Sequence, residues 1–153
     1  MKDIIALVLG GGRGTRLYPL TKYRSKPAVP VAGKYRLIDI PLSNCINSSI
    51  ADVMILAQYR PQSLLEHVGS GAPWDLNRDI SGGVKILSPY KARNDSDWYA
   101  GTADAVQQNF GFVKKDSPDL ILILSGDQLY RMDYRKIIDQ HLVQGKVVER
   151  LKI

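Results

Sequence analysis

Short apolar runs alternate with amphipathic segments along the chain. Three runs are continuous, at residues 4–9, 53–56 and 120–124. Runs of this kind, bounded by glycine or polar residues, are typical of strands buried on both faces of a parallel sheet. A fourth run, residues 83–87, contains Lys85 and predicts a partly exposed strand.

Four segments between or after these runs place apolar residues at helical spacing. They are residues 38–50, a segment opened by Pro61, residues 102–113 and residues 134–142. Pro41 fits the first turn of the first helix, and Thr102 fits the N-cap of the third. We expect the following side chains to face the sheet: Ile38, Leu42, Cys45, Ile46, Ile50, Leu64, Leu65, Val68, Ala103, Val106, Phe110 and Val113. The alternation predicts a Rossmann-like, three-layer α/β/α domain with a mostly parallel sheet.

Ligands of such sheets bind beyond the carboxyl ends of the strands. The loops that follow Leu9, Leu56 and Leu124 should therefore converge on one site.

The first of these loops is rich in glycine. Four of its residues are Gly10, Gly11, Gly12 and Gly14. Without side chains, the backbone N–H groups can turn toward an anion, so the loop predicts a phosphate cradle. The loop is not a P-loop, because no Gly-Lys-Ser/Thr closes it, and Thr15 stands where the dinucleotide fingerprint needs glycine. The alternative is a strand-to-helix turn without a ligand, which needs one glycine rather than four.

Two cations, Arg16 and Lys26, lie downstream of the glycines. Pro19 and Pro27 make this stretch an irregular loop that can fold back over them. Positive charge there would neutralise the charge that develops on a leaving pyrophosphate. Taken singly, either residue is more often a solvated surface charge; beside the glycine loop, the phosphate role is favoured.

Asp127 follows the apolar run 120–124 within the sequence Ser-Gly-Asp. A carboxylate at the carboxyl edge of a sheet is a candidate Mg²⁺ ligand, because Mg²⁺ bound to phosphates takes one or two carboxylates and water. The alternative is an aspartate that caps the following turn.

Composition narrows the class of protein. The chain has 153 residues, 44% of them hydrophobic and 24% charged, as expected for one globular domain. Eight basic residues and one acidic residue lie within residues 1–36, interleaved with glycine, proline and apolar residues. This pattern favours the polyphosphate of a small ligand over nucleic acid.

No apolar run suits a membrane span or signal peptide, so we expect a cytoplasmic protein with no membrane partner. Cys45, the single cysteine, indicates neither a disulfide nor a metal site.

Several segments carry a family resemblance. Residues 10–21 (GGGRGTRLYPLT) and 26–30 (KPAVP) resemble the signature of the sugar-phosphate nucleotidylyltransferases. Residues 33–48, 98–106 and 126–134 are similar to the glucose-1-phosphate adenylyltransferase family within it. The resemblance extends over residues 2–142 and implies the reaction of ATP with glucose 1-phosphate to give ADP-glucose and pyrophosphate, with Mg²⁺ as cofactor.

The resemblance also implies roles for individual residues. Residues 10–15 would hold the triphosphate, and Arg16 would contact the departing pyrophosphate. Lys26 would lie near the α-phosphate, and Asp127 would bind the metal. Gly101 and Thr102 would border the nucleotide, and Tyr99 would line the glucose 1-phosphate pocket. The alternative for Trp98 and Tyr99 is packing on the first turn of the helix that follows. Gln58 would face the nucleotide, a regulatory surface or solvent.

Three departures from the family pattern leave alternatives open. Residues 88–91 (SPYK) replace a Gln-Gln pair that helps many relatives to read the base, so thymidylyl or guanylyl transfer stays an alternative to adenylyl transfer. Residues 143–153 do not resemble the family's next apolar strand. The second half of the catalytic domain and a carboxyl-terminal β-helix are also missing from this sequence. We therefore expect little or no activity from this chain alone, with a non-catalytic nucleotide-binding or partner-binding module as the alternative. Complete relatives are expected to be allosterically regulated homotetramers.

Overall fold

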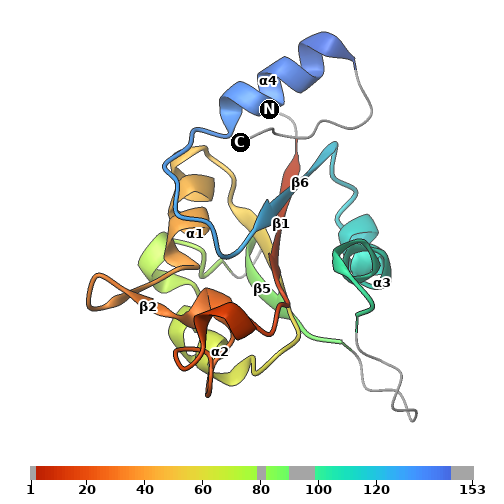
Figure 1. The fold of residues 1–153 in the computed structure, drawn as a ribbon. Helices are drawn as coiled ribbons and strands as arrows, with labels where there is room; N and C mark the ends of the chain where they lie inside the picture. Colours follow the sequence, from red (N-terminus) through yellow and green to blue (C-terminus); the bar gives the residue numbers. More distant parts are fainter. Residues whose placement is uncertain (1–2, 79–81, 90–98, 146–153) are drawn as a thin grey trace.

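The computed structural model describes residues 3–78, 82–89 and 99–145 (Figure 1). Its main sheet has four parallel strands in the order β5-β4-β1-β6. The strands are β1 (Ile4–Gly10), β4 (Asp52–Ala57), β5 (Gly83–Leu87) and β6 (Leu120–Ser125). Each lies within one residue of a predicted run, as expected for apolar segments of a parallel sheet. The parallel α/β fold is confirmed.

Helices cover both faces of this sheet (Figure 1). They are α1 (Asp39–Asn47), α2 (Gln62–Val68), α3 (Thr102–Lys115) and α4 (Arg135–Gln144). The short elements are η1 (Thr15–Leu17), η2 (Lys26–Ala28), η3 (Ala72–Trp74) and the antiparallel hairpin of β2 (Pro30–Val31) and β3 (Tyr35–Arg36). Helix α3 lies on one side of the sheet, whereas α1 and α2 lie on the other (Figure 1). This arrangement is the predicted three-layer one.

The core follows the two-residue period of the strands. Ala6, Val8, Val53 and Ile55 point into the larger cluster, which includes side chains of α1, α2 and α4. Ile5, Leu7 and Met54 point the other way and pack with Val113 of α3. Each fully buried valine, leucine, isoleucine or methionine side chain of this kind contributes about 1.5–3 kcal/mol, so the central strands contribute a large part of the stability of the domain.

Strand β6 is less buried than its sequence predicts. Ile121 and Ile123 are 37% and 52% exposed, so burial on both faces is wrong for this run. Among the described strands, β6 pairs only with β1, which makes it an edge strand. An apolar edge strand is a route to association between chains.

Helix α3 also differs from its prediction at its start. The N-cap is Gly101, without a side-chain cap, so Thr102 is not the capping residue. Asp104 supplies the polar partner instead, since its Oδ2 accepts hydrogen bonds from the Ala100 N–H and the Gln108 side chain, both at 2.8 Å. A carboxylate in the first turn is favoured by the helix dipole.

Three predicted core positions are exposed. In α3 the buried residues are Ala105, Asn109 and Val113, at a spacing of four, while Ala103 and Phe110 face outward. The polar Asn109 belongs to the buried face because its amide is hydrogen bonded there, which a search for apolar periodicity misses. In α2, Leu64 and Val68 are buried and Leu65 is 39% exposed.

Replacing either of two glycines by alanine should change the free energy of unfolding, in opposite directions. Gly111 lies within α3 and Gly145 follows α4, and an added Cβ would meet nothing within 4 Å at either position. Only Gly145 has a positive φ, of 61°. We expect Gly111→Ala to raise the free energy of unfolding by about 0.5–1 kcal/mol, because alanine restricts the unfolded chain and favours a helix. Gly145→Ala should lower it by about 1 kcal/mol. Chemical denaturation of both variants checks this, and a shared sign would contradict it.

Candidate functional site

The loops after β1 and β4 meet at the carboxyl edge of the sheet, as predicted. An added Cβ on Gly10 would lie 3.4 Å from both the Leu56 carbonyl oxygen and Pro27 Cγ. On Gly11 it would lie 3.5 Å from Oε1 of Gln58. The loop therefore lies beside the end of β4 and beside η2, where an added Cβ would make ordinary van der Waals contacts.

Gly14 closes the glycine loop onto the segment that follows. Its φ of 64° is a left-handed conformation that favours glycine. An added Cβ would lie only 2.8 Å from Thr21 Cγ2 and 3.1 Å from Lys26 Cβ. The buried Thr21 hydroxyl donates a 2.9 Å hydrogen bond to the Gly14 carbonyl. The chain thus folds back over the glycines, as the two prolines predict.

The outer part of the same loop is open. Gly12, Arg13, Thr15 and Arg16 are exposed, and an added Cβ on Gly12 would meet nothing within 4 Å. The structure therefore leaves this stretch accessible to a ligand at the end of β1.

Lys26 and Asp127 form an ion pair across 101 residues of sequence. Burial raises the pKa of Asp127, but hydrogen bonds from the Lys26 ammonium and the Ser125 hydroxyl, with the Lys26 charge, outweigh it. The pKa of Asp127 therefore lies below its usual value, and the carboxylate is ionised at neutral pH. Both side chains are partly exposed, at 36% and 26%, so the pair is accessible to a ligand.

Main-chain hydrogen bonds connect the segment that carries Lys26 to the residues just before α1. The Ile38 N–H donates to the Pro27 carbonyl at 3.0 Å, and the Leu37 N–H donates to the Val29 carbonyl at 3.1 Å. Lys26 is thereby tied to the start of α1.

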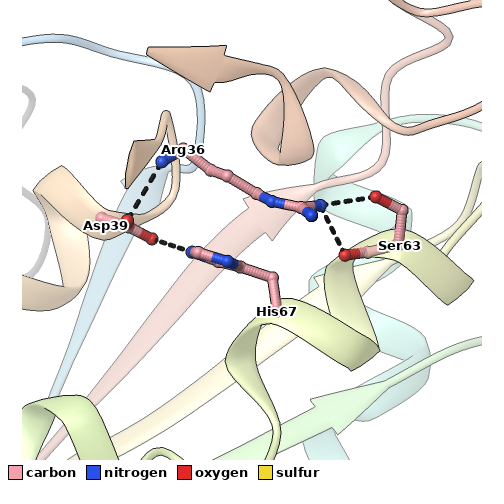
Figure 2. A network of polar contacts seen from close by, with 4 residues as sticks. All are labelled: Arg36, Asp39, Ser63 and His67. Atoms are coloured by element: carbon pink, nitrogen blue, oxygen red, sulfur yellow. Dashed lines mark hydrogen bonds and ion pairs between the residues drawn. The ribbon is translucent and has the colours of Figure 1, made fainter. Parts of the chain in front are cut away.

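A polar network ties this region to α2 in turn (Figure 2). The Asp39 carboxylate contacts His67 Nε2 at 2.6 Å and accepts the Arg36 N–H at 3.0 Å. The Arg36 guanidinium donates to the carbonyl and hydroxyl oxygens of Ser63 at 2.7 and 2.5 Å. Because Asp39 is 6% exposed, its hydrogen bonds compensate for the loss of water. The network joins β3 and the start of α1 to α2, and the sequence motif alone did not reveal it.

Tyr99 lies beside the site through its main chain. Its carbonyl accepts a 3.4 Å hydrogen bond from Gln58, whose side chain also borders Gly11. Its ring is 8% exposed, packs with Leu56 and Ala105, and receives a 2.8 Å hydrogen bond from Asn109 at the hydroxyl. The phenol therefore packs on the first turns of α3.

Gly101 and Thr102 lie two and three residues after this anchored tyrosine and are exposed. Trp98, Tyr90 and Lys91 lie outside the described residues.

A divalent cation fits the residues at this edge. Among residues 3–78, 82–89 and 99–145, no three His, Cys, Asp or Glu side chains form a metal-binding group. Mg²⁺ nevertheless keeps several waters and is commonly bound by one or two carboxylates together with substrate phosphates. One ionised, partly exposed carboxylate beside a glycine loop is that kind of donor.

Comparison with known proteins identifies the family. A sequence model described as nucleotidyl transferase matches residues 5–150. The chain belongs to the nucleotidyl transferase family. It is 55% identical over 145 residues to the glucose-1-phosphate adenylyltransferase of Thermotoga neapolitana. The aligned segment covers 95% of this chain and 34% of that protein. It is 56% identical over 140 residues to the enzyme of the same name from Mycoplasma mobile, covering 92% and 36%.

The chain spans about a third of the length of these curated relatives. A crystal structure from Bacillus anthracis, described as a glucose-1-phosphate thymidylyltransferase in complex with a sucrose, matches with a TM-score of 0.71 and 25% identity. The match covers 92% of this chain and 51% of that one. Within the described part of the chain, no helix is long and apolar enough to cross a membrane.

Proposed function

We propose that this chain supplies the nucleotide-binding part of a glucose-1-phosphate adenylyltransferase, which converts ATP and glucose 1-phosphate to ADP-glucose and pyrophosphate. The observation that carries the proposal is the closed glycine loop. Gly14 lies against Lys26, and the Lys26 ammonium pairs with Asp127 at the same sheet edge. The relatives that share about 55% of its residues bear the name of this enzyme.

In this proposal the glycine loop holds the triphosphate through its backbone N–H groups. Arg16, exposed on η1, contacts the departing pyrophosphate, and Lys26 contacts the α-phosphate. Binding of the nucleotide exchanges the Asp127 partner of Lys26 for a phosphate, which frees the carboxylate. Asp127 would hold Mg²⁺, which would supply neutralisation of phosphate charge.

The sugar phosphate attacks the α-phosphorus in line, so the protein contributes position and charge rather than a covalent intermediate. Gly101 and Thr102 border the nucleotide in this arrangement. Tyr99 lines the glucose 1-phosphate pocket in the same proposal. The proposal also includes a cytoplasmic, metabolite-regulated homo-oligomer for the complete enzyme, on the strength of the family resemblance.

A second nucleotide is a competing proposal, because the similar solved structure is described as a thymidylyltransferase. The adenylyl relatives are about twice as identical to this chain, which favours ATP.

Isothermal titration tests the proposal directly. We expect saturable ATP binding with Mg²⁺, weaker dTTP binding, and little glucose 1-phosphate binding or pyrophosphate release from this chain alone. Arg16→Ala should weaken ATP binding about tenfold or more, because a charge-assisted hydrogen bond to phosphate is lost. Lys115→Ala removes an exposed charge at the end of α3 and serves as the matched control. Equal ATP binding by Arg16→Ala and the parent would contradict the phosphate site proposed at the glycine loop. ADP-glucose formation at the rate of a complete enzyme would contradict the expected inactivity of this chain.

A further inference from the structure

The loop between β6 and α4 carries Asp127 but few main-chain contacts of its own. Its first residue is anchored, because the Gly126 N–H donates to the Leu9 carbonyl at 2.9 Å. An added Cβ on Gly126 would lie 3.0 Å from that oxygen, so the backbones touch. Among the described main-chain hydrogen bonds outside regular elements, residues 127–133 make none. Other groups must therefore hold this loop.

Asn44 of α1 and Ser48 at the C-cap of that helix supply those contacts. The Asn44 amide nitrogen donates to the Tyr130 carbonyl at 2.8 Å, and its oxygen accepts the Met132 N–H at 3.3 Å. One turn later, the Ser48 hydroxyl accepts the Tyr134 N–H at 2.8 Å. Residues four apart lie on the same face of a helix, so α1 binds the loop at two points.

The chemistry of Asn44 matches this task. It is 5% exposed, and burying an amide is unfavourable unless both of its ends are hydrogen bonded. A carbonyl and an N–H two residues apart require one donor and one acceptor on the same short side chain, and the amide group provides both. No apolar residue on this face could replace it.

We infer that Asn44 is a positioning residue for Asp127. By fixing residues 130–132, it sets the path of the loop and so the place of the carboxylate relative to Lys26 and the glycine loop. The segment around residues 33–48 carries family resemblance without an assigned chemistry, and this contact gives part of it a role. The inference rests on the proposed function, since it takes Asp127 to be the ligand of the cation that accompanies ATP.

The test is a titration of Mg²⁺ at a fixed ATP concentration, with ATP binding to the chain as the readout. Asn44→Ala should raise the Mg²⁺ concentration at half-maximal binding about tenfold, in the range seen when groups that orient a metal ligand are removed. ATP binding in EDTA should stay the same. Asn44→Asp fills the same space but places an oxygen against the Tyr130 carbonyl, so it should shift the midpoint in the same direction and carries the test if Asn44→Ala does not fold.

Leu42→Val is the matched control, because it loosens the same helix without touching a polar contact of the loop. A merely structural role for Asn44 predicts that variants of equal thermal stability share one Mg²⁺ midpoint, and that result overturns the inference. Asp127→Asn, measured alongside, separates the two proposals. If Asp127→Asn shifts the midpoint and the Asn44 variants do not, only the positioning role fails; if Asp127→Asn has no effect, the metal role fails and the positioning role fails with it.

Discussion

Asp127→Asn is expected to weaken the affinity for ATP in the presence of Mg²⁺ about 100-fold, equivalent to about 2.7 kcal/mol. The amide keeps the shape of the side chain but loses the negative charge that a hard cation requires. The carboxylate is ionised in the parent, since its hydrogen bonds with Lys26 and Ser125 lower its pKa despite partial burial. Titrations with ATP in saturating Mg²⁺ and in EDTA measure the difference.

The same variant should behave differently without metal. Lys26 loses its anionic partner, so its ammonium is free to contact a phosphate, and ATP binding in EDTA should be equal to or stronger than that of the parent. Asp133→Asn is the control, because Asp133 lies in the same loop and pairs with Arg135 instead. A loss of affinity that is equal in Mg²⁺ and in EDTA would indicate a damaged loop rather than a lost metal ligand.

The sequence allows the sheet and the site edge to be predicted for a physical reason. Continuous apolar runs of four to six residues are typical of strands in a covered parallel sheet, and parallel strands bring their following loops together. The glycine loop and Asp127 were therefore placed correctly relative to the fold. Their pairing through Lys26 was not predictable, because it depends on the path of an irregular loop.

The burial predictions that were wrong or incomplete share a different cause. The exposure of Ile121 and Ile123 depends on how many strands pair with β6, which local pattern does not encode. Asn44 and Asn109 lie on buried helix faces where hydrogen bonds, not apolarity, decide burial. The one available signal was a polar residue at helical spacing within an otherwise apolar stripe, as Asn44 and Ser48 are around Leu42 and Cys45.

Gly14→Ala is expected to lower the free energy of unfolding by about 2–5 kcal/mol and to weaken ATP binding. A left-handed φ costs a residue with a Cβ about 1–2 kcal/mol, and the contact at 2.8 Å with Thr21 Cγ2 adds about 1–3 kcal/mol of overpacking. The same Cβ would press on Lys26 at 3.1 Å, so the phosphate-binding cation would also move. Urea denaturation and ATP titration report the two effects separately.

Thr21→Ser separates the two sources of strain. Serine lacks the Cγ2 that the new methyl would strike but keeps the hydroxyl that donates to the Gly14 carbonyl. In the Thr21→Ser background, Gly14→Ala should lose the part of its cost due to Thr21 Cγ2 and keep about 1–2 kcal/mol from its φ, together with any cost of the Lys26 contact. The difference between the two backgrounds measures how tightly the loop closes on the segment that carries Lys26. Identical costs in both backgrounds would mean that the loop does not close on Thr21, and the path from the glycines to Lys26 and Asp127 would have to be different.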